Sequence, residues 1–232
     1  FDILPLESPE KTAEIAAAAM AEGTLAFKVK MNQDVKTSVA RVQKVREATG
    51  DKVMLVVDAN TTWTPKLAVS VCAMIEEYNV TMVEQPVPGH DIEGMAFITK
   101  NTRVRIGADE SMRPDYMAEL MRRRAADVVN IKINREGGLL PSKKAAALAE
   151  ANGIEGLCGS VIQGALIDAA AAHLFASTPA IVYNESGKAP AWHDLDIVTG
   201  FRVEKGMVKV PEGPGLGVEV NEKILRKFLA KD

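Results

Sequence analysis

Three acidic residues follow three short apolar runs of the sequence at nearly regular intervals. Asp58 follows VMLVV, Glu84 follows VTMV and Asp109 follows VRIGA, so the acids are 26 and 25 residues apart. If the runs are parallel strands with a helix in each gap, the three side chains emerge side by side at the carboxyl ends of the strands. Three convergent carboxylates repel one another, and a divalent cation that prefers oxygen ligands, Mg²⁺ or Mn²⁺, would neutralise them. The spacing therefore predicts a metal site.

Lysines occupy equivalent positions on both sides of these acids. Lys28 and Lys30 alternate in FKVK, one repeat before Asp58, and Lys132 lies in VVNIKIN, one repeat after Asp109. A lysine within an apolar strand is costly to bury unless its ammonium meets anions or takes part in chemistry. We therefore expect acid or base groups beside the metal. Salt bridges to the three acids are the alternative interpretation, and the two roles are compatible.

Polar residues near the same strand ends are candidates for orienting ligands or contacting a substrate. Four residues belong to this group: Asn60, Gln85, Asn130 and Ser160. Asp51 and Asp127 instead precede their strands, so they are expected at the opposite ends with structural roles. Any one acid alone would be better explained as a loop residue or a helix cap. Their occurrence in phase across consecutive repeats is what favours a site.

The composition is that of an ordinary globular protein. Of the 232 residues, 47% are hydrophobic and 25% are charged, and the net charge is −3. This charge gives no reason to expect nucleic acid as a partner, and no apolar stretch suggests a membrane span. Cys72 and Cys158 carry no paired-spacing motif, so we expect two buried thiols in a reducing compartment, the cytoplasm.

A strand-like run followed by a helix-like run recurs about eight times, and the strand-like runs lack polar alternation, as in a parallel sheet covered on both faces. The expected strands are Ile3–Leu4, Ala26–Met31, Val53–Asp58, Thr81–Glu84, Val104–Ala108, Val128–Ile133, Gly156–Gly159 and Ile181–Tyr183. The expected helices are Pro9–Glu22, Asp34–Thr49, Pro65–Tyr78, Ile92–Lys100, Pro114–Arg124, Pro141–Asn152 and Ile162–Ala176. This α/β pattern predicts a closed (β/α)8 barrel, TIM-like, in residues 1–200. Residues 201–232 predict a hairpin and a terminal helix that pack on the barrel or on another segment.

The motifs at these positions resemble those of the enolase superfamily. FKVKM, VVDANTTW, MVEQPV, GADES, VNIKINREGG and PEGPGLGVEV occur in the order and spacing of its muconate lactonizing (muconate cycloisomerase) subgroup, within the mandelate racemase/muconate lactonizing enzyme family. The resemblance implies a modified (β/α)7β barrel, a homo-oligomer, and Mg²⁺ held by Asp58, Glu84 and Asp109. It also implies that Lys30 and Lys132 are acid/base groups on opposite faces of a small carboxylate substrate. Lys28 would assist Lys30.

The implied reaction removes a proton α to a carboxylate and gives an enolate. Two opposed bases permit racemisation or epimerisation, which we expect for an amino-acid derivative or a dipeptide. Asp194 and Asp196 resemble an acidic pair that holds a substrate ammonium in dipeptide epimerases of the subgroup, and a solvated acidic loop is the alternative. Muconate-type cycloisomerisation is the second expectation. Acid dehydration, a phosphate-binding barrel isomerase and a non-catalytic metal-binding scaffold rank below these two.

Two further expectations concern residues and domains outside this set. GLCGSVIQG lacks the histidine that the mandelate racemase branch would need after the seventh strand, and His173 is expected to be a packed structural residue. The resemblance also implies an N-terminal capping domain that closes over the pocket. Because the sequence begins at the expected first barrel strand, we expect it to be the C-terminal barrel portion, with weak or no activity by itself.

Overall fold

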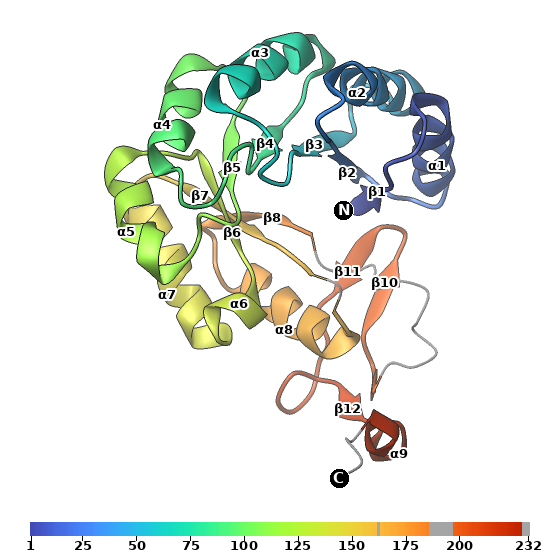
Figure 1. The fold of residues 1–232 in the computed structure, drawn as a ribbon. Helices are drawn as coiled ribbons and strands as arrows, with labels where there is room; N and C mark the ends of the chain where they lie inside the picture. The colour runs from blue at the N-terminus through green and yellow to red at the C-terminus, as the bar shows by residue number, and fades with distance from the viewer. Residues whose placement is uncertain (162, 186–196, 229–232) are drawn as a thin grey trace. The chain divides into compact units, whose positions relative to one another are not determined.

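The computed structural model of the protein describes residues 1–161, 163–185 and 197–228. Eight strands follow one another in sequence order in one sheet, and helices connect them (Figure 1). The strands are β1 (Asp2–Leu4), β2 (Ala26–Lys30), β3 (Met54–Asp58), β4 (Met82–Glu84), β5 (Ile106–Ala108), β6 (Val128–Ile131), β7 (Glu155–Cys158) and β8 (Ile181–Asn184). The pairs from β1–β2 to β5–β6, and the pair β7–β8, are parallel. All eight predicted strands are present, several of them shorter than predicted, and the TIM-barrel-like fold class is confirmed.

The helices between these strands begin and end at residues that the sequence makes suitable. They are α1 (Pro9–Ala21), α2 (Val35–Thr49), α3 (Pro65–Ile75), α4 (Ile92–Asn101), α5 (Pro114–Arg123), α7 (Leu139–Ala151) and α8 (Ala165–Ala176). Three of them start with proline, whose missing N–H costs little in a first turn. Helix α2 ends at Thr49 and is capped by Gly50, whose φ of 72° is accessible to glycine without strain.

Both faces of the central strands β3 to β6 are covered, which explains their apolar runs. In β3, Leu55, Val56 and Val57 have no exposed surface although consecutive side chains point to opposite faces. Around β7, Leu157 and Cys158 are buried, and α8 contributes the alanine-rich buried stretch Ala169–Ala172. Cys72 and Cys158 are both free and buried, as predicted.

Some short elements were not predicted. The run VVNIKIN looked like one strand to Ile133, but β6 ends at Ile131 and a four-residue helix, α6 (Ile133–Glu136), follows Lys132. Gly137, with φ of 89°, ends that helix in the left-handed region. The alternation of Ile131 and Ile133 with polar residues resembled a strand, and so short a helix has no 3.6-residue period to reveal it. The predicted end of the third helix is a separate 3₁₀ turn, η1 (Glu76–Tyr78).

The predicted hairpin near the C-terminus is present. Its strands are β10 (Arg202–Glu204) and β11 (Met207–Lys209), and the turn residues Lys205 and Gly206 have φ of 49° and 74°. Two positive φ values match the twist of the flanking strands. Strand β9 (Val198–Thr199) precedes the hairpin and pairs antiparallel with β12 (Glu219–Val220), which follows it. The helix α9 (Glu222–Leu225) and the 3₁₀ turn η3 (Arg226–Phe228) come after β12. The pair of two-residue strands is too short for a sequence pattern to indicate.

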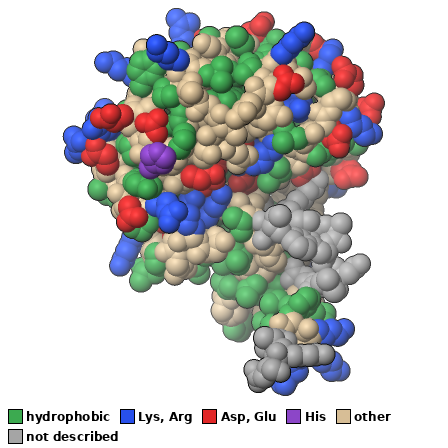
Figure 2. Space-filling view, viewed as in Figure 1, with side chains coloured by type: hydrophobic (Ala, Val, Ile, Leu, Met, Phe, Trp, Pro, Cys, Tyr) green, Lys and Arg blue, Asp and Glu red, His purple; other side chains and the backbone are tan. Residues whose placement is uncertain are grey.

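The chain divides into two compact units. The first comprises residues 1–130 and 149–155, and the second comprises residues 131–148 and 156–232. The expected boundary at residue 200 stays a prediction. Positive and negative side chains are intermixed on the face that Figure 2 shows, consistent with the small net charge. Within the described ranges, no helix has both the length and the apolar character needed to cross a membrane.

Arg46 holds together the turns at the amino-terminal side of β3 and β4. Its buried guanidinium donates hydrogen bonds to the backbone oxygens of Tyr78 (2.8 Å), Gly50 (2.6 Å), Val53 (2.9 Å) and Asn79 (3.0 Å). One side chain therefore provides hydrogen-bond donors for four carbonyl groups, two in the segment before β3 and two in the segment before β4.

We expect Arg46→Met to lower the free energy of unfolding by about 3 kcal/mol, because buried carbonyls that lose their donor keep the cost of desolvation. Urea denaturation followed by circular dichroism measures the change. Arg103→Met is the control, since its side chain is 88% exposed and an exposed pair contributes at most about 1 kcal/mol. Equal effects of the two substitutions would contradict the role of Arg46.

Candidate functional site

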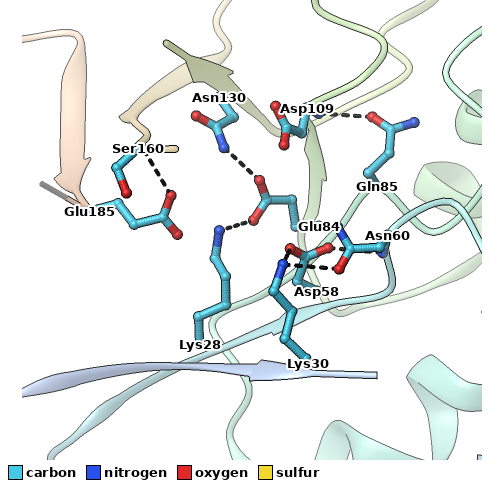
Figure 3. A network of polar contacts seen from close by, with 10 residues as sticks. All are labelled: Lys28, Lys30, Asp58, Asn60, Glu84, Gln85, Asp109, Asn130, Ser160 and Glu185. Atoms are coloured by element: carbon cyan, nitrogen blue, oxygen red, sulfur yellow. Dashed lines mark hydrogen bonds and ion pairs between the residues drawn. The ribbon is translucent and has the colours of Figure 1, made fainter. Parts of the chain in front are cut away.

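The register of the sheet puts the predicted acids on one face. Lys30 pairs with Asp58, Asp58 with Glu84, and Glu84 with Gly107, which is two residues before Asp109. Paired residues of neighbouring parallel strands share a face, and so do residues two apart in one strand. The side chains at these positions therefore project from the same face at the carboxyl ends of β2 to β5 (Figure 3).

Glu84 is a buried carboxylate with partners on both oxygens. It is 1% exposed, its Oε2 forms an ion pair with Nζ of Lys28, and its Oε1 accepts a hydrogen bond from Nδ2 of Asn130 at 2.5 Å. Lys28 itself is 3% exposed. Since a charge taken out of water needs a counter-charge and hydrogen bonds, Lys28 and Asn130 make the burial of Glu84 tolerable.

Asp58 has a different partner, the second lysine of β2. Nζ of Lys30 lies 2.6 Å from Oδ2 of Asp58 and donates a hydrogen bond to Oδ1 of Asn60 at 2.9 Å. The backbone N–H of Asn60 donates to Oδ1 of Asp58 at 2.9 Å. Asn60 has φ of 44°, a left-handed conformation that asparagine adopts more readily than most residues. The turn after β3 thus orients both Asp58 and the ammonium of Lys30.

Asp109 is buried and lies directly after β5. Its backbone N–H donates to Oε1 of Gln85 at 2.8 Å. The sequence pointed to Gln85 as a residue that orients ligands, and the structure shows that its amide contacts the backbone of the loop that carries Asp109. Ser111, which was not among the predicted residues, belongs to the same contact, since its N–H also donates to Oε1 of Gln85.

The donor set formed by Asp58, Glu84 and Asp109 has the chemistry of a site for a hard divalent cation. All three are carboxylates at adjacent strand ends, and all-oxygen ligation suits Mg²⁺ or Mn²⁺. In the described part of the chain, no three His, Cys, Asp or Glu side chains are grouped as a ready-made metal site. The ammonium groups of Lys28 and Lys30 form ion pairs with the carboxylates of Glu84 and Asp58, respectively.

Lys132 follows β6 with an extended backbone, φ −110° and ψ 115°, and is half-buried. Side chains alternate along an extended segment, so Lys132 projects from the same side of its strand as Asn130. Lys132 is also the residue immediately before α6.

Two polar residues follow β7 and β8. The N–H of Ser160 donates to Oε2 of Glu185 at 3.2 Å, and the N–H of Glu185 donates to the carbonyl oxygen of Cys158 at 2.9 Å. Buried Glu185, directly after β8, was not predicted. Asp194 and Asp196 lie outside the described residues.

His173 lies within α8, as predicted, and its Nε2 is 3.2 Å from the carbonyl oxygen of Leu216. This contact joins the helix to the turn-rich segment before β12, which agrees with a structural role.

A sequence profile of the enolase C-terminal domain-like family matches residues 11–224 of the chain. The chain belongs to this family. Its motifs had indicated the same superfamily, and that prediction is confirmed.

Related proteins carry out isomerisations of small carboxylates, according to their names. The chain is 35% identical to an L-Ala-D/L-Glu epimerase from Bacillus subtilis (strain 168) over 92% of its length and 59% of that protein. It is 34% identical to muconate cycloisomerase 1 from Rhodococcus opacus, over 84% of the chain and 53% of the relative. The chain therefore spans between about half and three fifths of the length of these relatives.

Solved structures of family members agree with the fold. An N-succinyl Arg/Lys racemase from Bacillus cereus ATCC 14579 superposes with a TM-score of 0.92 and 32% identity, over 97% of this chain and 61% of that one. A dipeptide epimerase from Enterococcus faecalis V583, complexed with Mg and the dipeptide L-Leu-L-Tyr, superposes with a TM-score of 0.84 and 32% identity, over 94% of this chain and 62% of that one. Membership of the enolase superfamily implies a divalent metal.

Cys158 is the last residue of β7 and is fully buried. Burial, followed by the negative charges of Glu185 and Asp168, raises the pKa of its thiol to about 12. Burial also raises the pKa of Cys72 to about 11. Both thiols are therefore protonated near neutral pH, and neither is a candidate nucleophile.

We expect both thiols of the folded protein to react with iodoacetamide at pH 8 about 100-fold more slowly than in urea, because only an accessible thiolate reacts. Mass spectrometry of quenched samples measures the rate at each cysteine. The unfolded chain is the control and should take up two labels, one at Cys72 and one at Cys158. Rapid labelling of Cys158 in the folded protein would be inconsistent with its burial beside two acids.

Proposed function

We propose that the protein is a Mg²⁺-dependent isomerase that racemises or epimerises an amino-acid derivative or a dipeptide by moving the proton α to its carboxylate. The observation that carries the proposal is the alignment of Lys30, Asp58 and Glu84 at paired positions of three strands, with Asp109 two residues beyond the next. Family membership supports it, because the named relatives include epimerases and racemases.

In this proposal Asp58, Glu84 and Asp109 hold the cation. When bound, the cation would coordinate the substrate carboxylate and stabilise the negative charge that develops as the α proton leaves. The carboxylates fix the place of that charge, and Lys28 adds a positive charge beside Glu84. The C–H group α to a carboxylate is too weak an acid for an amine to deprotonate unaided. These groups must therefore be assembled before the proton moves.

Lys30 is proposed as one base, and its surroundings support this role. Its side chain is 26% exposed, whereas that of Lys28 is 4% exposed on the same strand and face. An amine that exchanges protons with a substrate must be reachable, and Lys30 meets this requirement while remaining fixed by Asp58 and Asn60. Lys132 is proposed as the second acid/base group: while Lys30 takes the α proton, the ammonium of Lys132 donates its own proton to the other face of the α carbon, and the roles are exchanged in the reverse direction. Asn60, Gln85 and Asn130 would orient the carboxylates.

The substrate class rests on the relatives and on the sequence. A dipeptide complex with Mg is known for the Enterococcus faecalis relative, and its chain resembles this one. We propose that Ser160 contributes to substrate binding and that Asp194 and Asp196 hold the ammonium of a dipeptide or amino-acid derivative. An acidic pair complements a cation, as a neutral loop would not.

Cycloisomerisation of a muconate is the second candidate. The Rhodococcus opacus relative carries this name at nearly the same identity as the epimerases. The same carboxylates and one lysine would suffice, because a proton is then exchanged with an alkene-derived carbon rather than transferred across one α carbon. The two reactions share the stabilised enolate and differ in its fate.

We expect the full-length protein in D₂O with Mg²⁺ to exchange the α proton of dipeptides or N-acyl amino acids, as followed by ¹H NMR. Lys30→Ala and Lys132→Ala should each lower the rate of racemisation at least about 100-fold, since general acid–base catalysis typically contributes that much. In one substrate enantiomer the α proton faces only one of the two lysines, so only the variant that keeps this lysine should still exchange the α proton for deuterium.

The controls separate the alternatives. Lys36→Ala, an exposed residue of α2, should leave exchange unchanged. Turnover of a muconate without exchange of any α proton would replace the epimerase by the cycloisomerase. No exchange and no turnover with any carboxylate would favour the non-catalytic barrel.

We expect Asp58→Asn, Glu84→Gln and Asp109→Asn each to weaken Mn²⁺ binding at least about 10-fold, because each removes a charged oxygen ligand. Free Mn²⁺ is measured by electron paramagnetic resonance. Asp51→Asn is the matched control, since Asp51 is exposed and precedes β3 at the end opposite Asp58. Unchanged affinity in all three variants would exclude this metal site.

A further inference from the structure

Gln85 and Ser111 form a buried hydrogen-bonded pair next to the proposed cation site. Both residues are 0% exposed. Nε2 of Gln85 donates to the backbone oxygen of Val87 at 2.8 Å and to Oγ of Ser111 at 2.9 Å. Its Oε1 accepts from the N–H groups of Asp109 at 2.8 Å and Ser111 at 3.1 Å. The amide of Gln85 therefore uses both donors and both acceptor positions.

Ser111 extends the pair to a second loop. Its Oγ donates to the backbone oxygen of Gly89 at 2.9 Å, so it joins the segment after β4 to the segment after β5. The two segments lie so close that a Cβ atom at Gly89 would be 2.7 Å from the backbone oxygen of Glu110. No side chain fits at Gly89 unless one backbone moves. Glycine at this position therefore permits the close approach of the loop that carries Asp109.

The backbone of Gln85 is itself unusual. Its φ of 37° lies in the left-handed region, which a residue other than glycine rarely adopts. Such a conformation persists only where the surroundings hold it. Here the backbone N–H of Gln85 donates to the carbonyl oxygen of Gly107 at 2.8 Å, and the turn sends the side chain across to Asp109 and Ser111.

We infer that Gln85 and Ser111 are positioning residues that hold the Asp109 carboxylate ready for the cation. This inference rests on the proposed function, because it treats Asp109 as a ligand. Neither residue needs to touch metal or substrate. They act through the backbone of the 109–111 loop, whose amides would otherwise be free to rotate the carboxylate away from its neighbour Glu84 on β4. Groups of this kind tune affinity because a ligand already in place loses less conformational freedom on binding.

The first test is Ser111→Ala, compared with Ser142→Ala. The two serines are matched: both are 0% exposed, and each donates through Oγ to a glycine backbone oxygen, Gly89 at 2.9 Å and Gly138 at 2.8 Å. We expect Ser111→Ala to raise the Kd for Mn²⁺ about 10-fold, within the range for groups that orient metal ligands. Ser142→Ala should leave the Kd unchanged. Thermal unfolding of both variants shows whether they lose similar stability.

A spectroscopic readout separates positioning from a general loss of structure. The relaxation rate of water protons at bound Mn²⁺ rises when water replaces a protein ligand, so Ser111→Ala should show a higher rate per bound ion than the unaltered protein. Gln85→Met should have the larger effect, about 10- to 100-fold in Kd, because it removes all four hydrogen bonds. The double variant should lose less affinity than the sum of the two single losses, since the two residues share one hydrogen-bond network.

The outcomes divide cleanly between the two claims. If Asp109→Asn weakens Mn²⁺ binding while Ser111→Ala and Gln85→Met leave it unchanged, the positioning role is overturned and the metal site survives. If Asp109→Asn has no effect, or the protein binds no Mn²⁺, both are overturned. Equal effects of Ser111→Ala and Ser142→Ala also overturn the positioning role. Should Ser111→Ala not fold, Ser111→Cys, which keeps a weak donor, is expected to give a smaller loss of affinity in the same direction.

Discussion

The burial of carboxylates at the carboxyl ends of apolar strands is the constraint on which the site depends. Glu84 and Asp58 lie on β4 and β3, which are covered on both faces, and each would be unstable there as an isolated charge. Lys28 and Lys30 provide the opposite charges from β2. A buried ion pair of this kind is seldom more stabilising than an apolar pair of similar size. The arrangement is therefore better explained by chemistry than by stability.

The sequence was sufficient for the strands and for their order because two independent signals agreed. Apolar runs without alternation indicated parallel strands, and proline and glycine marked where helices begin and end. The elements that escaped prediction are short: α6, and the pair formed by β9 and β12. Their stability comes from glycine conformations and neighbouring contacts rather than from a repeated pattern, so a periodicity argument has nothing to detect.

The same reasoning placed the acids at neighbouring strand ends, as the register shows, but did not identify the residues that hold them there. The sequence indicated Asp58, Glu84 and Asp109 because each follows an apolar run at the equivalent position of its strand–helix repeat, and this spacing is visible in the sequence. Ser111 and Glu185 were missed because their importance lies in hydrogen bonds to residues 26 and 25 positions away. Such bonds depend on the register of strands and on loop conformations, such as the left-handed backbone of Gln85, that no spacing rule specifies. The sequence pointed to Gln85 but not to what it holds.

The two lysines of β2 show how one strand can serve two purposes. They lie two residues apart on one face, yet Lys28 is enclosed with Glu84 and Asn130 whereas Lys30 reaches Asp58 and Asn60 at a more open position. An enclosed ammonium with a buried partner cannot move away without leaving that carboxylate buried and without its counter-charge. An ammonium at the edge of the site can be replaced by water or by the substrate with less cost. The difference in surroundings, rather than in residue type, is thus the reason for proposing Lys30 as a base and Lys28 as a fixed positive charge.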